Sequence, residues 1–110
     1  MTTLPTLFSL SELEEREIIS GFFGRMIHSA KMTMAYWTVE QDALLPEHQH
    51  PHEQVLNLLE GEFQLQVDGK THHLMTGSVF VIPGNTPHSG RALTQCRILD
   101  VFQPTRDDYQ

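Results

Sequence analysis

The chain has 110 residues, the length of one domain, and we expect no second domain. Hydrophobic residues make up 39% and charged residues 19%, a composition typical of a globular protein rather than a disordered or fibrous one. Seven Lys and Arg against fourteen Asp and Glu give a net charge of -7 with His neutral. This sign argues against nucleic acid or an anionic membrane surface as a partner.

The same sequence gives indications of cellular location. No apolar stretch approaches the roughly 20 residues of a membrane span. The first ten residues contain no basic residue and are interrupted by Pro5, unlike a signal peptide. The one cysteine, Cys96, has no partner for an internal disulfide, and we interpret it as a small buried apolar residue. We therefore expect a cytoplasmic protein.

The first element in chain order is one short helix over residues 10–16. Ser11 followed by Glu14 fits a capping box, and acidic residues suit the first turn of a helix. Beyond it, short runs rich in β-branched and aromatic residues are separated by Gly, Pro and Asp, which predicts an all-β protein. The expected strands are Phe22–His28, Lys31–Glu40, His48–His50, Gln54–Leu59, Glu62–Val67, Lys70–Met75, Ser78–Ile82, His88–Leu93 and Gln95–Phe102.

The clearest pair of strands is a hairpin through Asp68-Gly69, a dipeptide suited to a type I′ turn. So many short strands in a small domain indicate a closed sandwich, jelly roll or barrel, because closure protects the sheet edges. We expect a single domain over residues 1–110, with an N-terminal segment over 1–20 and the barrel and C-terminal tail over 21–110.

Three of the seven histidines, His48, His50 and His52, lie within five residues. Alternate residues of an extended segment share a face, so His48 and His50 project the same way, as two imidazoles must to bind one metal ion. The pair His50 and His52 satisfies the same rule. Gln54 has the same parity and offers an amide oxygen, while His88 follows a strand and a tight turn that aims it back into a barrel. A solvated polar cluster is the alternative.

The spacing at these residues resembles the first motif of the cupin superfamily, which has H-x-H, a Glu and then a Gly. Here His48 and His50 are followed after three residues by Gln54, in place of Glu, and after six more by Gly61. The resemblance selects His48 and His50 as ligands and leaves His52 outside the metal site. It implies a double-stranded β-helix, or jelly-roll barrel.

The second cupin motif resembles the segment from Gly77 to His88. Pro83 lies where that motif has Pro, and Asn85 replaces the usual Gly. Because Asn is the commonest non-Gly residue in left-handed backbone geometry, we expect the turn to tolerate this change.

Two longer blocks, residues 47–61 and 99–109, look like the small single-domain KdgF-type pectin-degradation cupins. The resemblance implies an enzyme that opens 4,5-unsaturated monouronates from pectin or alginate into linear 4-deoxy-5-keto uronates. It also implies one divalent transition metal ion, held by His48, His50, Gln54 and His88. These donors leave zinc, nickel, manganese, iron and cobalt open. A neutral Gln leaves the cation its full charge, which suits an anionic substrate.

Three residues near the C-terminus are candidates for the reaction. Asp100 interrupts an apolar run, and a buried carboxylate is costly without a partner or a task. The resemblance favours proton transfer by Asp100 over an outward-facing position. Phe102 shares its parity and is either a pocket wall or a core residue. Arg106 follows in the tail, where it either binds the uronate carboxylate or pairs with Asp107 or Asp108.

Two other functions fit the same motifs: a metal-dependent dioxygenase and a non-catalytic sugar-binding module. We also expect a homodimer. The reason is the apolar content near the start of the chain, at Phe22, Phe23, Met26 and Ile27, which exceeds what a peripheral strand of a monomer needs.

Overall fold

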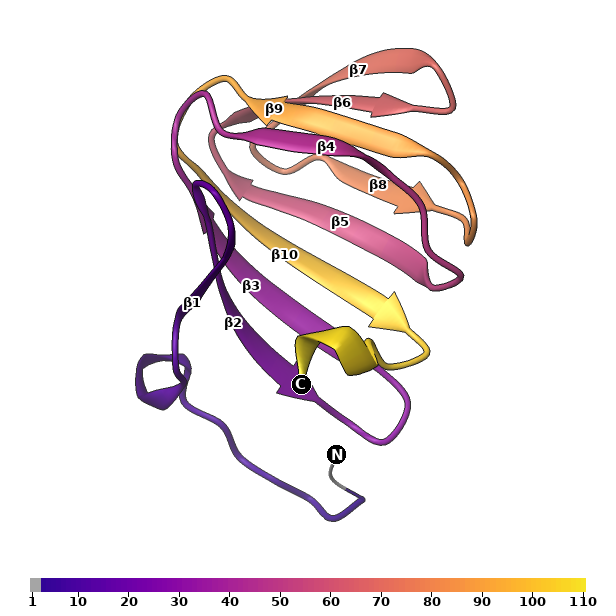
Figure 1. The fold of residues 1–110 in the computed structure, drawn as a ribbon. Coiled ribbons are helices and arrows are strands. Elements are labelled where there is room, and N and C mark those ends of the chain that lie inside the picture. Colours follow the sequence, from indigo (N-terminus) through magenta and orange to yellow (C-terminus); the bar gives the residue numbers. More distant parts are fainter. Residues whose placement is uncertain (1–2) are drawn as a thin grey trace.

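The structure is a computed structural model that describes residues 3–110, and it consists of two antiparallel sheets (Figure 1). The six-stranded sheet has the order β1-β2-β3-β10-β5-β8, and the four-stranded sheet has the order β4-β9-β6-β7. The strands are β1 Arg16–Ile19, β2 Phe22–His28, β3 Thr33–Val39, β4 Leu44–His48, β5 Glu53–Glu60, β6 Glu62–Val67, β7 Lys70–Met75, β8 Val79–Ile82, β9 His88–Ala92 and β10 Cys96–Gln103.

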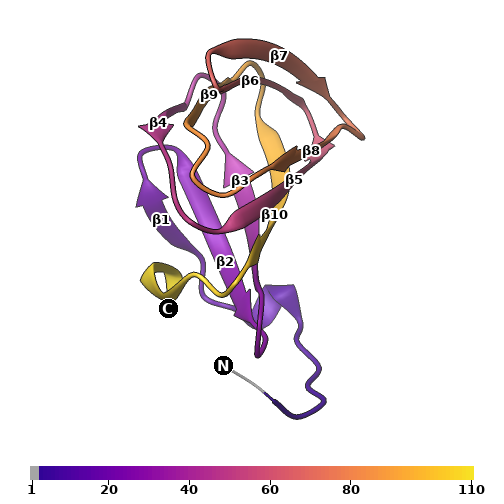
Figure 2. The same cartoon turned by 90° about the vertical axis from the view of Figure 1, so that its right-hand side faces the viewer.

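The two sheets face each other and enclose the core (Figure 2). Alternate residues of each strand point between the sheets, as the pleat requires. In β3 the inward residues Ala35, Trp37 and Val39 are buried, and from the opposite sheet Phe63 and Leu65 of β6 are buried as well. The interior is therefore apolar along most of the barrel.

Strand β10 lies at the centre of the six-stranded sheet, between β3 and β5. Its inward positions are Cys96, Ile98, Asp100 and Phe102, all of them buried. Asp100 therefore faces the barrel interior, and the outward orientation that the local sequence left open does not occur. The burial of Cys96 is as expected.

The expected strands from Phe22 onward are all present, except that His48–His50 is not a strand of its own. The strand in this region lies earlier in the chain than predicted. Strand β4 covers Leu44–His48, and the residues that follow it form a loop. The turn at Asp68-Gly69 has φ of 50° and 81°, and Asn85 has φ of 60°. All three residues therefore adopt the left-handed geometry that the sequence predicted for these two turns.

The N-terminal segment differs from the prediction. Instead of a helix over residues 10–16, there is a three-residue 3-10 helix, Leu10–Glu12, whose N-cap Ser9 makes no side-chain capping bond. Strand β1 starts at Arg16 and pairs with β2, so the sheet begins inside the segment assigned to residues 1–20. Among residues 3–110, none of the helices has the length and apolarity to cross a membrane.

Candidate metal centre

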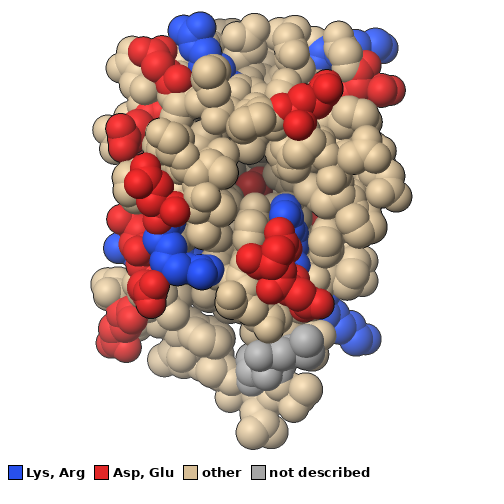
Figure 3. Space-filling model, viewed as in Figure 1, with Lys and Arg blue, Asp and Glu red and all other residues tan. Residues whose placement is uncertain are grey.

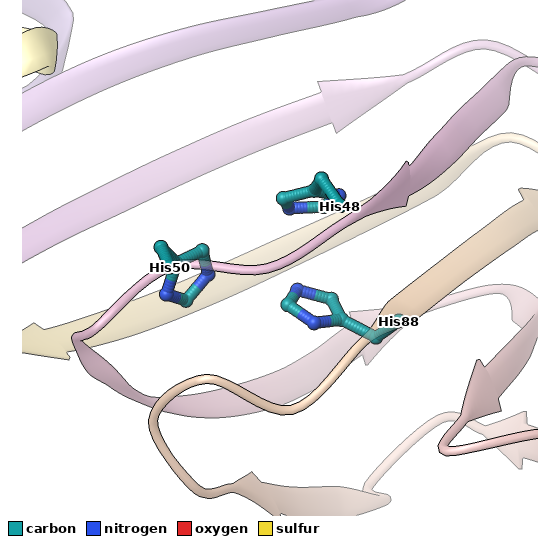
Figure 4. A group of neighbouring side chains, drawn as sticks. All are labelled: His48, His50 and His88. Carbon is teal, nitrogen blue, oxygen red and sulfur yellow. The ribbon is translucent and has the colours of Figure 1, made fainter.

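Three histidines come together at one end of the barrel. His48 ends β4 and lies directly opposite His88, the first residue of β9, in the register of the two strands. His50 reaches the same point from the loop that follows β4. The three rings point toward one another (Figure 4), and one ligand nitrogen from each lies within 4.8 Å of the others.

Main-chain carbonyls fix the orientation of all three rings. Nδ1 of His48, His50 and His88 lies 2.9, 3.0 and 2.8 Å from the carbonyl oxygens of Pro46, His52 and Thr86, respectively. A carbonyl only accepts hydrogen bonds, so each Nδ1 carries the hydrogen and each Nε2 presents a lone pair. Such outer hydrogen bonds are the usual companions of metal-binding histidines.

Gln54 adds a fourth donor atom. Its Nε2 donates to Oδ1 of Asp100 at 2.9 Å, which turns its Oε1 toward His50. Oε1 and Nε2 of His50 lie 3.2 Å apart, and with Nδ1 protonated both atoms are acceptors. Nε2 of His88 is buried without a hydrogen-bond partner among the described residues. These atoms are hydrogen-bond acceptors that face one another with no hydrogen between them. A cation between them would satisfy their lone pairs.

Burial keeps two of these imidazoles neutral. Burial, followed by the nearby charges of Arg106 and His88, lowers the pKa of His50 to about 4, against the opposing effect of its hydrogen bonds to His52 and Gln54. Burial also lowers the pKa of His88, against the opposing effect of its hydrogen bond to Thr86. A neutral imidazole is the form that binds metal, so the site is ready for a cation at neutral pH.

His52 does not join the cluster. The rings of His52 and His48 lie about equally far from that of His50, at 5.5 and 5.6 Å between centroids, but among the described residues the cluster of ligand atoms contains only His48, His50 and His88. His52 instead contributes its main-chain carbonyl, which orients His50. The geometry thus agrees with the cupin spacing, which selects His48 and His50 as candidate ligands and leaves His52 outside the site.

Asp100 lies beside the metal centre and is linked to it through Gln54. Its Oδ2 accepts a hydrogen bond from Nε1 of Trp37 at 3.0 Å, so both oxygens have donors. Burial raises the pKa of Asp100 to about 6, although the bonds from Gln54 and Trp37 and the charge of Arg106 oppose this shift. A carboxyl group with a pKa close to neutrality both accepts and returns protons readily.

These groups line a cavity of about 330 Å³ that opens between the two sheets. Figure 3 shows the face on which the molecule is hollowed, with basic and acidic side chains at the hollow. The polar wall contains His48, Gln54, His88 and Asp100, and much of the remaining lining is apolar. Its size suits a small molecule.

Phe102 and Arg106 both line this cavity. The guanidinium carbon of Arg106 lies 4.8 Å from the ring centre of Phe102 and 4.1 Å from that of Tyr109. Nε and Nη2 of Arg106 donate to the two carboxylate oxygens of Asp108, at 3.2 and 2.6 Å. The ion pair with Asp108, one of the two roles considered for Arg106, is therefore present. The Arg106 side chain is nevertheless only 10% exposed and belongs to the pocket.

Tyr109 and Trp37 also line the cavity, and the sequence analysis assigned neither of them to the pocket. The ring centre of Tyr109 lies 5.9 Å from that of Trp37 and 5.8 Å from that of Phe102, so the three form one aromatic wall. The alternation along β3 allowed only one of Tyr36 and Trp37 to face a cavity, and it is Trp37. No spacing in the sequence indicates that the C-terminal tail returns to the barrel.

A family model described as a cupin domain matches residues 35–102, more than half of the chain. The chain belongs to this cupin family. The two-sheet jelly roll is accordingly the cupin fold, and the second motif contributes His88 as the resemblance implied.

Solved structures agree with this assignment. The cupin chain is 25% identical to "KdgF from Halomonas sp.", with a TM-score of 0.91 over 97% of this chain and 100% of that one. It is 26% identical to an RmlC-like cupin from Shewanella frigidimarina NCIMB 400, with a TM-score of 0.92 over the whole of both chains. A variant oxalate decarboxylase of Bacillus subtilis shares the fold at 18% identity, with a TM-score of 0.81 over 94% of this chain and 31% of that one. The comparison with curated proteins gave no match.

Proposed function

We propose that this cupin is a metal-dependent enzyme that opens the ring of 4,5-unsaturated monouronates and forms linear 4-deoxy-5-keto uronates. The observation that carries the proposal is the hydrogen bond from Gln54 to Asp100. It joins a four-donor metal centre to a buried carboxyl group of nearly neutral pKa within one cavity. The likeness to KdgF over 97% of this chain and 100% of that one supports the substrate class that the sequence resemblance implied.

The substrate requires groups of the kind that line this cavity. An unsaturated cyclic uronate carries a carboxylate and an enol ether joined to a hemiacetal. A divalent cation held by His48, His50, Gln54 and His88 would bind and polarise a substrate oxygen. We assign to Asp100 the transfer of a proton from the hemiacetal hydroxyl to carbon 4, as the bond from the anomeric carbon to the ring oxygen breaks and the enol becomes a ketone. The reaction gains and loses no atoms.

The pocket also supplies positive charge, which an acidic protein needs to bind an acidic sugar. The bonds to Asp108 use Nε–H and one hydrogen of Nη2, so Nη1 and the second hydrogen of Nη2 form the remaining edge of the guanidinium, and two parallel hydrogen bonds from such an edge match a carboxylate. Phe102 packs against the guanidinium and forms the apolar wall beside it. We therefore assign carboxylate binding to Arg106 and a wall of the substrate site to Phe102.

The direct test supplies the unsaturated monouronate to the protein loaded with zinc, nickel, manganese, iron or cobalt. Loss of the enol absorbance is expected with at least one metal and not with the metal-free protein. Failure with all five metals would remove the proposal. Oxygen uptake by the iron-loaded protein would favour a dioxygenase instead, and uronate binding without turnover would favour a sugar-binding module.

Replacing Arg106 tests its assigned role. Lys keeps the charge but has no planar fork and stacks less well between Phe102 and Tyr109, so we expect Arg106→Lys to raise KM about tenfold with a smaller change in kcat. Arg106→Ala should raise KM further. Steady-state kinetics with Arg91→Ala provide the control, because Arg91 also pairs with an aspartate, Asp42, but on the exposed surface. Unchanged kinetics in Arg106→Ala would exclude substrate binding by this residue.

We also propose a homodimer, on a surface other than the one the sequence indicated. Phe22 packs in the core of its own chain, against Trp37, and Met26 packs against that core, while Phe23 and Ile27 are only partly exposed. Exposed apolar side chains instead occur at Val79 and Val81 of β8, an edge strand of the six-stranded sheet. Such an edge favours pairing with a second copy. We expect sedimentation of the wild type to give a dimer and Val81→Lys to weaken it; a dilute wild-type monomer would contradict the proposal.

The cytoplasmic location, the lack of nucleic-acid and membrane partners and the single-domain assignment over residues 1–110 stay predictions. A small-molecule substrate is consistent with the cavity.

A further inference from the structure

The C-terminal segment, residues 104–110, forms one wall of the pocket although it belongs to neither sheet. It leaves the end of β10 and lies across the ends of β2 and β3 (Figure 1). A 3-10 helix, Asp107–Tyr109, brings Arg106 and Tyr109 to the same side, where their side chains stack on each other and line the cavity. The pocket is complete only while this segment stays in place.

A chain of hydrogen bonds fastens both ends of the 3-10 turn to the barrel. The main-chain N–H of Arg106 donates to Oγ1 of Thr33 at 2.9 Å. Oγ1 of Thr33 lies 2.8 Å from Nδ1 of His28, and Nε2 of His28 lies 3.3 Å from the carbonyl oxygen of Tyr109. The chain therefore starts at Arg106 and ends at Tyr109.

Only one arrangement of hydrogens satisfies every member of this chain. The Tyr109 carbonyl accepts only, so Nε2 of His28 carries a hydrogen, and Nδ1 of the neutral ring is then an acceptor. Thr33 accepts from Arg106, which leaves its hydroxyl hydrogen for His28. Because Thr33 is fully buried, loss of its hydroxyl would leave the Arg106 N–H without a partner, and such a loss is costly.

Arg16 provides a second, separate anchor. Its Nη2 donates to the Tyr109 carbonyl oxygen at 2.8 Å, so this oxygen has two donors. Arg16 is the first residue of β1, the strand that sequence analysis did not predict. Together Arg16, His28 and Thr33 connect the tail to three adjacent strands, and we name these three residues the tail clamp.

We propose that the tail clamp positions Arg106 and Tyr109 for substrate binding by holding the C-terminal segment across the pocket. For its effect on kinetics this inference rests on the proposed function. None of the three clamp residues is assigned a contact with substrate, and each acts through the main chain of the tail. Weakening the clamp should therefore affect substrate binding more than the chemical step.

The kinetic test compares variants of the metal-loaded protein. Thr33→Val keeps the shape and removes the hydroxyl, and Arg16→Met removes the second anchor at a partly exposed position. Each is expected to raise KM about tenfold with a smaller change in kcat, whereas Thr33→Ser should retain the wild-type KM. The matched control is Arg25→Met, because Arg25 of the neighbouring strand β2 also donates to a main-chain carbonyl, that of Leu13. Its KM should not change.

A second measurement does not depend on turnover. The chain has only two tyrosines, so protein labelled with 3-fluorotyrosine gives two fluorine signals, and that of Tyr36 on the outer side of β3 is an internal reference. In Thr33→Val and Arg16→Met the Tyr109 signal should sharpen and move toward that of free fluorotyrosine, while the Tyr36 signal stays unchanged. Thermal unfolding of each variant reports any global loss of stability.

The outcomes separate the inference from the proposed function. An immobile Tyr109 and an unchanged KM in both Thr33→Val and Arg16→Met would overturn the tail clamp. Equal increases in KM in Thr33→Val, Thr33→Ser and Arg25→Met would also overturn it, because they would reflect general destabilisation. If the wild type fails to turn over the uronate, the proposed function fails, and the Tyr109 signal alone then decides whether the clamp holds the tail.

Discussion

Replacing Asp100 by Asn is expected to lower kcat by about 10²- to 10⁴-fold, the usual contribution of a general acid or base. Asp100 is buried in the cavity, next to the proposed ligand Gln54, and its pKa is raised to about 6. Asn has nearly the same size but does not titrate, so it cannot carry a proton between substrate oxygen and carbon. Single-turnover and steady-state kinetics of the metal-loaded variant measure the effect.

The hydrogen bonds of Asp100 require a control for this variant. Both of its oxygens accept, from Gln54 and from Trp37, whereas Asn has only one accepting oxygen. The Asn amide group would face one of these donors, and rotation of Gln54 would then turn Nε2 toward the metal. Asp100→Asn should therefore weaken metal binding as well as catalysis.

A double variant separates these two effects. In Asp100→Asn with Gln54→Glu, the new amide donates to one Glu oxygen, and the other Glu oxygen faces the metal. We expect this protein to bind metal stoichiometrically while its kcat stays far below that of the wild type. Recovery of wild-type kcat in the double variant, or full activity in Asp100→Asn alone, would exclude proton transfer by Asp100.

The sequence predicted those parts of the fold that depend on local chemistry. The residue types at Asp68-Gly69 and at Asn85 predicted left-handed backbone geometry, and the structure has it at these positions. The helix over residues 10–16 was wrong in extent, because the chain becomes extended at Leu13 and Arg16 already belongs to a strand that pairs with β2. Pairing in a sheet overrides weak helix signals, and the polar start of this strand gave no alternation by which to recognise it.

The sequence also indicated which histidines come together, but for His50 the physical reason differs from the one assumed. Parity in a strand placed His48 and His50 on one face, but His50 lies in a loop, and the turn of that loop brings it to the site. The contact of His48 with His88 follows from the register of β4 and β9, forty residues apart. The packing of Tyr109 on Arg106 depends on Thr33 and other residues far away in the chain, so no local pattern indicated it.

Alanine at any of His48, His50 or His88 is expected to abolish stoichiometric metal binding. Each ring presents one Nε2 to the same point, and Oε1 of Gln54 is the further donor atom beside them. Metal content after dialysis, measured by elemental analysis, should fall from about one ion per chain to nearly none, because a protein site for a divalent cation of this class needs about three or four ligands. Activity should be lost in parallel.

His52→Ala should retain the metal, and the reason is specific to this structure. His50 is oriented by the carbonyl oxygen of His52, which belongs to the main chain and is still present in the alanine variant. His73→Ala is a matched control, because His73 is an exposed histidine that pairs with Glu62 away from the site. Metal retained by His48→Ala and lost by His52→Ala would mean that the ligands are His50 and His52, the alternative that parity alone allowed.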